Sequence, residues 1–347
     1  MGEISKVLQI GSGSMGTRRL RDLSARRDAR GDVQLALLEA RDDRREAAAN
    51  RFGINGFATP EEALAWGPDA IVISTPPDAH APYVELAMQQ GLSFFSEADI
   101  WTYDYAVVER AVREKGIVAA PSCTFYFLPV VQRLRDVVRE DLGKLHAYAM
   151  CLSVDAPGWH PGEGAEYYAR RRSTAPGREM VPFELIGLGY VFGEPRAVSG
   201  TVGRRGELAM DSEDTWCLQM ELESGATGQL AVLMASPQTV RKGIAVGSNG
   251  IVEFDLAAGT IVRRLPGRGI DDTLPCGTIA ERLEATYAAE INTFLDAAQG
   301  KREWPFSYRQ SGMLTGTLAA AERSAVSGRT EPVDPLKPPA LLPDQYR

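Results

Sequence analysis

The N-terminal third of the chain alternates between short apolar runs and segments with apolar residues at helical spacing. The apolar runs predict strands at residues 7–10, 33–38, 70–74, 93–96 and 117–120. Helical periodicity between them predicts helices at residues 14–24, 42–52, 79–90 and 103–114. Strands and helices that alternate in this way form a parallel sheet with right-handed crossovers. We therefore predict an α/β domain with a doubly wound parallel sheet over residues 1–121.

The pattern changes after Pro121. A helix is predicted at 128–138, strands at 145–154 and 216–222, glycine-punctuated hairpins within 225–265, and helices at 280–298 and 310–326. The tail from Glu331 is too rich in proline to form either element. We predict an α+β domain over residues 122–347, with an open, mostly antiparallel sheet. Because one apolar face of such a sheet would be costly in water, we expect a homodimer or homotetramer.

Composition and charge narrow the function classes. The chain is 44% hydrophobic and 24% charged, as in globular proteins, and its formal charge of -8 with scattered basic residues argues against a nucleic-acid partner. Its apolar runs are shorter than the ~20 residues of a membrane span, and the N-terminus lacks a signal-peptide core, so we expect a cytoplasmic protein without membrane contact. The 4 cysteines and 3 histidines lack metal-ligand spacing, which predicts reduced thiols and no metal site.

A glycine-rich turn follows the first predicted strand and opens the first predicted helix. It has the sequence Gly11-Ser12-Gly13-Ser14-Met15-Gly16. In a dinucleotide-binding fold, such glycines permit a tight turn, a close approach of the backbone to the pyrophosphate, and close packing of helix on strand. In this strand and helix context we expect Gly11, Gly13, Ser14, Met15 and Gly16 to contact the cofactor in a Rossmann domain. A glycine-rich turn without a ligand is the alternative.

An acidic residue follows the second predicted strand, where the fold places the adenosine ribose. The carboxylate of Glu39 would accept hydrogen bonds from the ribose hydroxyls and repel a 2'-phosphate, which favours NAD. Arg41 is expected in the same part of the site. With Arg44 and Arg45 it could instead meet a phosphate, so NADP is the alternative cofactor, although Arg44 and Arg45 also fit a solvated helix start.

Further motifs carry a resemblance to a known family. Ser74-Thr75-Pro76-Pro77-Asp78-Ala79-His80 follows the third clear strand, and Phe95-Ser96-Glu97 follows the fourth. Together with the glycine motif they resemble the glucose-fructose oxidoreductase and inositol dehydrogenase (Gfo/Idh/MocA) family, and Gly193-Glu194-Pro195 and the AAERSA segment near residue 322 extend the resemblance over the whole chain. The resemblance implies a Rossmann domain followed by a substrate domain. It also implies cofactor contacts at Ser74, Thr75, Pro76 and Glu97, whereas His80 either contacts the cofactor or caps a helix.

The chain departs from this family at the residues that transfer protons. Relatives commonly have Glu-Lys-Pro, whose lysine hydrogen-bonds the reacting hydroxyl, but this chain has Glu97-Ala98-Asp99. Relatives also have an aspartate and a histidine four residues apart before the Gly-Glu-Pro turn. Glu179 and Phe183 stand at those positions here. The resemblance therefore implies that another group handles the proton.

We consider three candidate catalytic residues, Glu97, His160 and Glu179. His160 lies in a polar loop, and histidine as a residue type suits acid-base chemistry at neutral pH, although simple solvent exposure explains this residue equally well. Glu179 fits the first turn of a helix, where its charge would also stabilise the helix dipole. Glu97 ends a parallel strand, at the edge where open α/β sheets bind ligands. Further residues could line a sugar pocket but rank below these three candidates: Tyr126, Tyr167, Tyr168 and the arginines 170–172.

These observations favour an NAD(P)-dependent oxidoreductase that acts on a hydroxyl or ketone of a sugar, cyclitol or related polyol. One alternative is an enzyme that retains NAD and uses transient oxidation for elimination, epimerisation or glycoside cleavage. The other is a non-catalytic protein that binds a dinucleotide or a sugar. The acids Glu97, Glu179 and Glu184 favour chemistry over sensing.

Overall fold

The first folding unit combines stretches that are far apart in the sequence. In the computed structural model, which describes residues 5–99, 104–159, 171–206 and 212–336, this unit contains the residues up to Asp99, a stretch that ends at Cys123, and the distant segment Ala285–Ser311. Thr124–Glu284 and the residues from Gly312 onward belong to the second unit. A division into 1–121 and 122–347 thus leaves out the return of Ala285–Ser311 to the first unit. Helical periodicity within that segment does not specify which sheet its apolar face covers.

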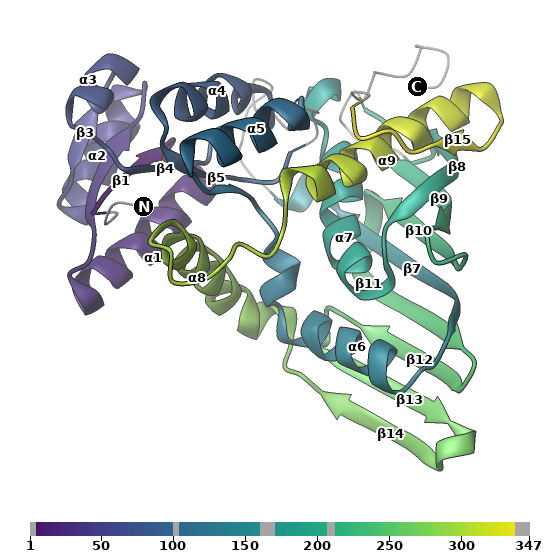
Figure 1. Ribbon diagram of the computed structural model, residues 1–347. Helices are drawn as coiled ribbons and strands as arrows, with labels where there is room; N and C mark the ends of the chain where they lie inside the picture. The colour runs from purple at the N-terminus through teal and green to yellow at the C-terminus, as the bar shows by residue number, and fades with distance from the viewer. Residues whose placement is uncertain (1–4, 100–103, 160–170, 207–211, 337–347) are drawn as a thin grey trace. The chain divides into compact units, whose positions relative to one another are not determined.

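A parallel sheet forms the centre of the first unit (Figure 1). Its strands are β1 (Lys6–Ile10), β2 (Gln34–Leu38), β3 (Asn55–Phe57), β4 (Ala70–Ile73), β5 (Ser93–Ser96) and β6 (Ala119–Pro121). The strand order is β3-β2-β1-β4-β5-β6, and every pair is parallel. The order reverses between β1 and β4, so the carboxyl ends of these two strands form the point where such sheets bind ligands. The predicted doubly wound fold is confirmed.

Helices cover both faces of this sheet. They are α1 (Ser14–Arg30), α2 (Asp42–Phe52), α3 (Pro60–Ala65), α4 (Ala81–Gln90), α5 (Tyr105–Lys115) and the second half of α8 (Ile279–Ala298). On one face, Leu23 of α1 and Phe294 of α8 belong to the same buried cluster as Phe95 of β5. On the other face, helices α3, α4 and α5 pack against alternate residues of the strands. The pattern did not predict β3 and α3, because elements this short leave little periodicity.

The second unit contains a larger mixed sheet. Within the described residues its strands are β7 (Leu145–Asp155), β8 (Pro195–Gly203), β9 (Thr215–Leu222), β10 (Thr227–Leu233), β11 (Ala235–Gly247), β12 (Gly250–Asp255), β13 (Thr260–Leu265), β14 (Ile270–Pro275) and β15 (Glu331–Pro332). Their order is β14-β13-β12-β11-β7-β10-β9-β8-β15, and only the pair of β7 and β10 is parallel. The expectation of a tail without structure is wrong at β15, which pairs with β8 at the sheet edge, where proline is tolerated.

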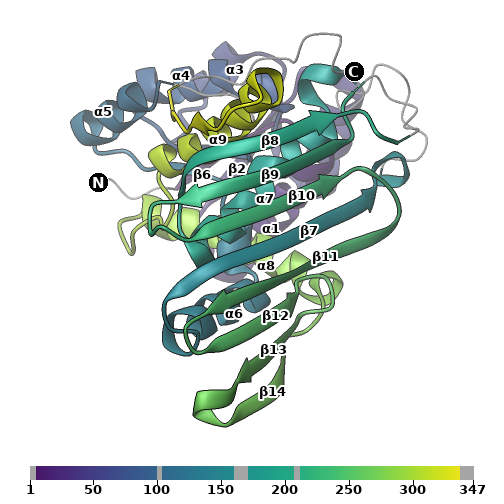
Figure 2. The ribbon, with the colours of Figure 1, turned by 90° about the vertical axis from the view of Figure 1, so that its right-hand side faces the viewer.

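Within the described part of the chain, helices cover one face of this sheet and leave the other open (Figure 2). The helices of the second unit are α6 (Pro129–Glu140), α7 (Pro176–Phe192) and the part of α9 (Tyr308–Ser327) from Gly312 onward. This unit also has short 3-10 turns at Thr124–Phe127, Ala156–Trp159, Arg172–Thr174 and Pro266–Arg268, and the first unit has one at Pro77–Ala79. Figure 2 shows the strands in front of α6 and α7. Ile244, Val246 and Ile251 are partly exposed on β11 and β12. No helix in the described part of the chain is long and apolar enough to span a bilayer.

The place of α8 in the first unit can be tested by truncating Phe294. Its ring is fully buried and lies 5.9 Å from the ring of Phe95. We expect Phe294→Ala to lower the free energy of unfolding by about 3 to 5 kcal/mol, measured by chemical denaturation. Val107→Ala, on an exposed position of α5, should change it by less than about 0.5 kcal/mol. Equal effects of the two substitutions would contradict this packing.

Candidate functional site

Two glycines of the motif after β1 are required by the protein itself. Gly11 has a φ of +83°, and a Cβ atom there would lie 2.9 Å from the carbonyl oxygen of Ser74, the residue after β4. A Cβ atom at Gly16 would lie 2.1 Å from the carbonyl oxygen of Gly11. These positions therefore let α1 begin close to β1 and β4. They explain the fold of the turn without a ligand.

Gly13 has no such internal reason to be glycine. Its φ is -65°, which any residue can adopt, and a Cβ atom there would approach only the Nη1 of Arg44, at 3.9 Å, among the described residues. The position precedes Ser14 and Met15 in the first turn of α1, whose backbone N–H groups and dipole favour an anion. Open space at this point fits a pyrophosphate that approaches the backbone. The motif therefore has the shape that dinucleotide binding requires.

Glu39 closes the other side of the glycine turn. Its Oε2 accepts hydrogen bonds from the backbone nitrogen and the hydroxyl of Ser12, both at 2.9 Å, and its Oε1 accepts one from the backbone nitrogen of Arg41 at 3.1 Å. The Arg41 guanidinium pairs with Asp43 at 2.6 Å, and that of Arg45 pairs with Asp42. Acids therefore offset both of these cations, which fits a ribose diol better than a 2'-phosphate.

His80 occupies an internal position. It is fully buried, its Nε2 lies 2.8 Å from the carbonyl oxygen of Thr75, and its Nδ1 lies 3.4 Å from Asp99. His80 is the N-cap residue of α4, as the capping alternative predicts, although its side chain makes no capping hydrogen bond. Burial lowers the pKa of His80, but the hydrogen bond and charge of Asp99 outweigh this and raise it overall. His80 therefore links Thr75, which follows β4, to Asp99, which follows β5.

Four residues that follow β4 and β5 lie at the sheet edge where such folds bind ligands. Ser74 directs its hydroxyl at Glu97, 3.3 Å away, and exposed Pro76 ends this stretch before the 3-10 turn. The Oγ1 of Thr75 is buried and has no hydrogen-bond partner within the described part of the chain. An orphaned buried hydroxyl at the switch point is a ready contact for a bound polar group.

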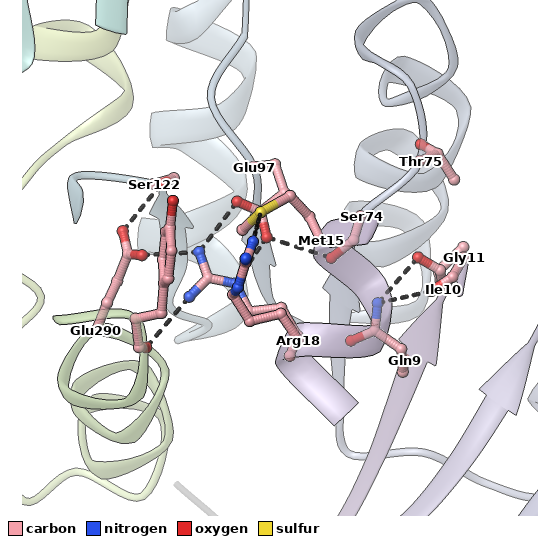
Figure 3. A network of polar contacts seen from close by, with 12 residues as sticks. Gln9, Ile10, Gly11, Met15, Arg18, Ser74, Thr75, Glu97, Ser122 and Glu290 are labelled. Carbon is pink, nitrogen blue, oxygen red and sulfur yellow. Dashed lines mark hydrogen bonds and ion pairs between the residues drawn. The ribbon is translucent and has the colours of Figure 1, made fainter. Parts of the chain in front are cut away.

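A buried arginine holds Glu97. The Nε and Nη2 of Arg19, on α1, bond the two oxygens of Glu97 at 2.7 and 3.0 Å. Arg19 also donates to Glu290 of α8 at 2.7 Å, and its guanidinium lies 4.7 Å from the centre of the Phe95 ring. Figure 3 shows Ser74, Glu97, Ser122 and Glu290 joined in this network of polar contacts. Glu97 is thereby fixed as the acceptor of a bidentate ion pair.

The second carboxylate of the network fixes the end of β6. Glu290 accepts hydrogen bonds from the Ser122 hydroxyl at 2.9 Å and from the Cys123 backbone nitrogen at 2.7 Å. The sequence analysis identified neither Arg19 nor Glu290 as part of the site. Both carry a charge on the buried face of an amphipathic helix, and such a residue needs a buried partner. The sequence therefore indicated that Arg19 and Glu290 each need a buried partner, but it did not indicate which residue that partner is.

The second unit holds the remaining candidates. Glu179 lies half-buried in the first turn of α7, as predicted, and Phe183 one turn later packs against Phe125 with 4.8 Å between ring centres. Of the lower-ranked candidates, Tyr126 stacks on Tyr190 and Arg172 is paired with Glu213. His160 lies outside the described residues, as do Tyr167, Tyr168 and Arg170.

Glu184 belongs to an internal ion pair of the second unit. It is buried, and its Oε1 lies 2.7 Å from the Nη2 of Arg241 on β11. Burial raises the pKa of Glu184, and the adjacent Arg241 opposes that rise. Arg241 also lies 5.2 Å from the centre of the Phe125 ring. Glu184 therefore contributes to the packing of α7 on the sheet, not to an exposed acidic set.

Comparison with known structures agrees with this fold. GenD2 from gentamicin A biosynthesis, solved with NAD, aligns with a TM-score of 0.78 and 24% identity over 96% of this chain and 97% of that one. A levoglucosan dehydrogenase solved with NADH and L-sorbose aligns with a TM-score of 0.83 and 16% identity over 96% of this chain and 99% of that one. A putative myo-inositol dehydrogenase from Sinorhizobium meliloti aligns with a TM-score of 0.74 and 19% identity over 95% of this chain and 100% of that one. No curated protein sequence matches the chain.

A family comparison addresses the first unit directly. Residues 5–113 match the model described as an oxidoreductase family with an NAD-binding Rossmann fold, Gfo/Idh/MocA. The match covers β1 through α5, and so it includes the glycine motif, Glu39, the Ser74 to His80 stretch and Glu97. Residues 5–113 therefore match the NAD-binding Rossmann domain of this oxidoreductase family, the family that the motifs resemble.

Proposed function

We propose that the chain transfers a hydride between NAD and a carbon that bears a hydroxyl or ketone in a sugar, cyclitol or related polyol. The observation that carries this proposal is the open space at Gly13, with Glu39 beside it. Together they provide room for a pyrophosphate and an acceptor for a ribose diol. When bound, NAD supplies the hydride acceptor and NADH the hydride donor.

The substrate class is supported by the second unit and by its likeness to known structures. The aligned structures include a levoglucosan dehydrogenase and a putative myo-inositol dehydrogenase. Phe183, half-buried one turn after Glu179, packs on the buried Phe125, and ligand pockets commonly combine aromatic side chains with a few polar groups. Glu179 lies half-buried on the same helix. This combination suits a polyol with apolar ring faces and hydroxyl edges.

The proposed roles follow from the contacts. Gly11, Gly13 and the first turn of α1 would hold the pyrophosphate, and Glu39 the ribose. Ser74, Thr75 and Glu97 would border the nicotinamide end. Because Ala98 replaces the usual lysine and Arg19 engages both oxygens of Glu97, we assign proton transfer to His160 or Glu179.

We also propose that the protein self-associates as a homodimer or homotetramer through the open face of its large sheet. Ile244, Val246 and Ile251 leave more than a third of their surface exposed on that face. Burial of such a face removes apolar area from water, and this stabilises an oligomer.

Gly13 provides the test of the proposed function. The wild-type protein should bind NAD and form NADH, followed at 340 nm, with at least one member of a panel of sugars and cyclitols. Gly13→Val should abolish dinucleotide binding, because its side chain would occupy the space of the pyrophosphate, while its thermal unfolding stays unchanged. Gly267→Val is the matched control, since that position is also open and has no positive φ. Normal NAD binding by Gly13→Val would remove the assignment of this site.

Cofactor choice is a second expectation. If Glu39 binds the ribose diol, the dissociation constant for NADP should exceed that for NAD by at least about tenfold, because a lost hydrogen bond or a repulsion is worth ~1 to 3 kcal/mol. Isothermal titration of both dinucleotides measures this. Glu39→Ala should narrow the difference, whereas equal affinities in the wild type would count against the role of Glu39.

Proton transfer is the third expectation. Glu179→Gln or His160→Ala should lower turnover at least about 100-fold while NAD binding stays intact, because loss of a general acid or base usually costs about 10² to 10⁴ in rate. Steady-state rates on the identified substrate and NAD titrations measure the two effects separately. If both variants keep near-normal turnover, the proton is handled elsewhere.

A further inference from the structure

Three arginines lie at the start of α2. Arg41 is the N-cap residue of this helix, and Arg44 and Arg45 are its third and fourth residues. The guanidinium of Arg41 pairs with Asp43, and that of Arg45 pairs with Asp42. Arg44 is exposed, and within the described part of the chain its guanidinium forms no hydrogen bond or ion pair. Of the three, Arg44 is thus the one whose cation is available to a ligand.

The acids near Arg44 are engaged by other groups. Glu39 accepts three hydrogen bonds, one of them from the backbone nitrogen of Arg41. The charge of Asp43 also acts on Arg44, but its carboxylate lies 2.6 Å from the Arg41 guanidinium. The exposed Glu46 is two positions further along the helix, where it does not face Arg44. The protein therefore compensates the charge of Arg44 only in part.

The Arg44 side chain extends to the glycine turn. Apart from the residues next to Gly13 in the chain, the described atom closest to a Cβ atom placed at Gly13 is the Nη1 of Arg44, at 3.9 Å. This is the open space that fits a pyrophosphate. The helix α2 gains no stability from the cation, because the helix dipole opposes a positive charge near a helix N-terminus. A ligand thus explains the position of Arg44 better than the helix that carries it.

A guanidinium at this point matches a pyrophosphate in charge and in shape. Its planar N–H donors form a fork that binds two phosphate oxygens at once. The first turn of α1 supplies backbone N–H groups and the positive end of its dipole to the same space. The other cations near the start of α1 are placed differently, since Arg19 bonds two carboxylates and Arg18 lies 5.0 Å from the centre of the Tyr287 ring. Arg44 thus brings a positive charge to this space from a second helix.

We propose that Arg44 binds the pyrophosphate of the dinucleotide through its guanidinium. This inference rests on the proposed cofactor site, and it adds to that site a residue from outside the glycine motif. NAD and NADP share the pyrophosphate, so this contact strengthens the binding of both by the same factor. The difference between them, at the 2' position of the ribose, is recognised by Glu39.

The test compares the dissociation constants of the wild type and Arg44→Gln for NAD and for NADP, by isothermal titration. Glutamine keeps a polar side chain but removes the charge, so both constants should rise by at least about fivefold and by the same factor. Because salt screens charges, added sodium chloride should weaken NAD binding more in the wild type than in Arg44→Gln. Arg44→Lys keeps the charge but not the fork, and its constants should lie between the two. Thermal unfolding should not change, because Arg44 is exposed.

Arg51 provides a matched control on the same helix. It is exposed, it lies seven positions after Arg44, about 10 Å further along the helix axis, and its guanidinium is 5.1 Å from the centre of the Phe52 ring. Arg51→Gln removes the same charge from α2 at a point away from the glycine turn. It should leave both dissociation constants unchanged.

Three results would overturn the inference while the cofactor site stands. The first is unchanged constants in Arg44→Gln, or equal effects of Arg44→Gln and Arg51→Gln. The second is a rise in the NADP constant alone, which would assign Arg44 to the 2'-phosphate. The third is a rise without a change in salt dependence, which would indicate stacking on the adenine. If the wild type binds neither dinucleotide, the cofactor site itself is wrong, and the inference with it.

Discussion

The assembly of the first unit depends on one buried guanidinium. Moving a charge such as that of Arg19 out of water costs several kcal/mol unless it is paired and hydrogen-bonded. Burial alone would lower the pKa of Arg19, but the carboxylates of Glu97 and Glu290 outweigh it and keep the group charged. Because Glu290 comes from α8, the same ion pairs that fix the edge of β5 also hold a distant segment on the N-terminal sheet. The geometry of the site and the assembly of the first unit therefore both depend on the pairing of Arg19 with Glu97 and Glu290.

The second unit also contains a buried arginine that is paired with a carboxylate. Arg178 on α7 is fully buried and bonds both oxygens of Glu322 on α9, at 2.8 and 3.2 Å. Burial raises the pKa of Glu322 to about 7, against the opposing effect of Arg178. This pair explains the glutamate of the AAERSA segment, because Glu322 binds α9 to α7, the helix that carries Glu179. Part of the family resemblance in this half of the chain thus reflects packing.

The sequence predicted features whose cause is local. Alternating apolar runs identified β1, β2, β4 and β5, and the glycine motif with Glu39 indicated a Rossmann domain, because strand, turn and acid lie within one short unit. Contacts between distant residues were not predictable in this way. Neither the pairing of Arg19 with Glu290 nor that of His80 with Asp99 has a periodic signal. The attachment of α8 to the first sheet was missed for the same reason, since periodicity specifies a buried face but not what covers it.

The missing lysine changes how Glu97 must be understood. Both oxygens of Glu97 accept hydrogen bonds from the buried Arg19, which also donates to Glu290. A bidentate pair of this kind fixes the position of the carboxylate. Glu97 is therefore suited to a positioning role, and the proposed proton transfer is assigned to another side chain. Among the described residues that side chain is Glu179, which lies half-buried in the first turn of α7.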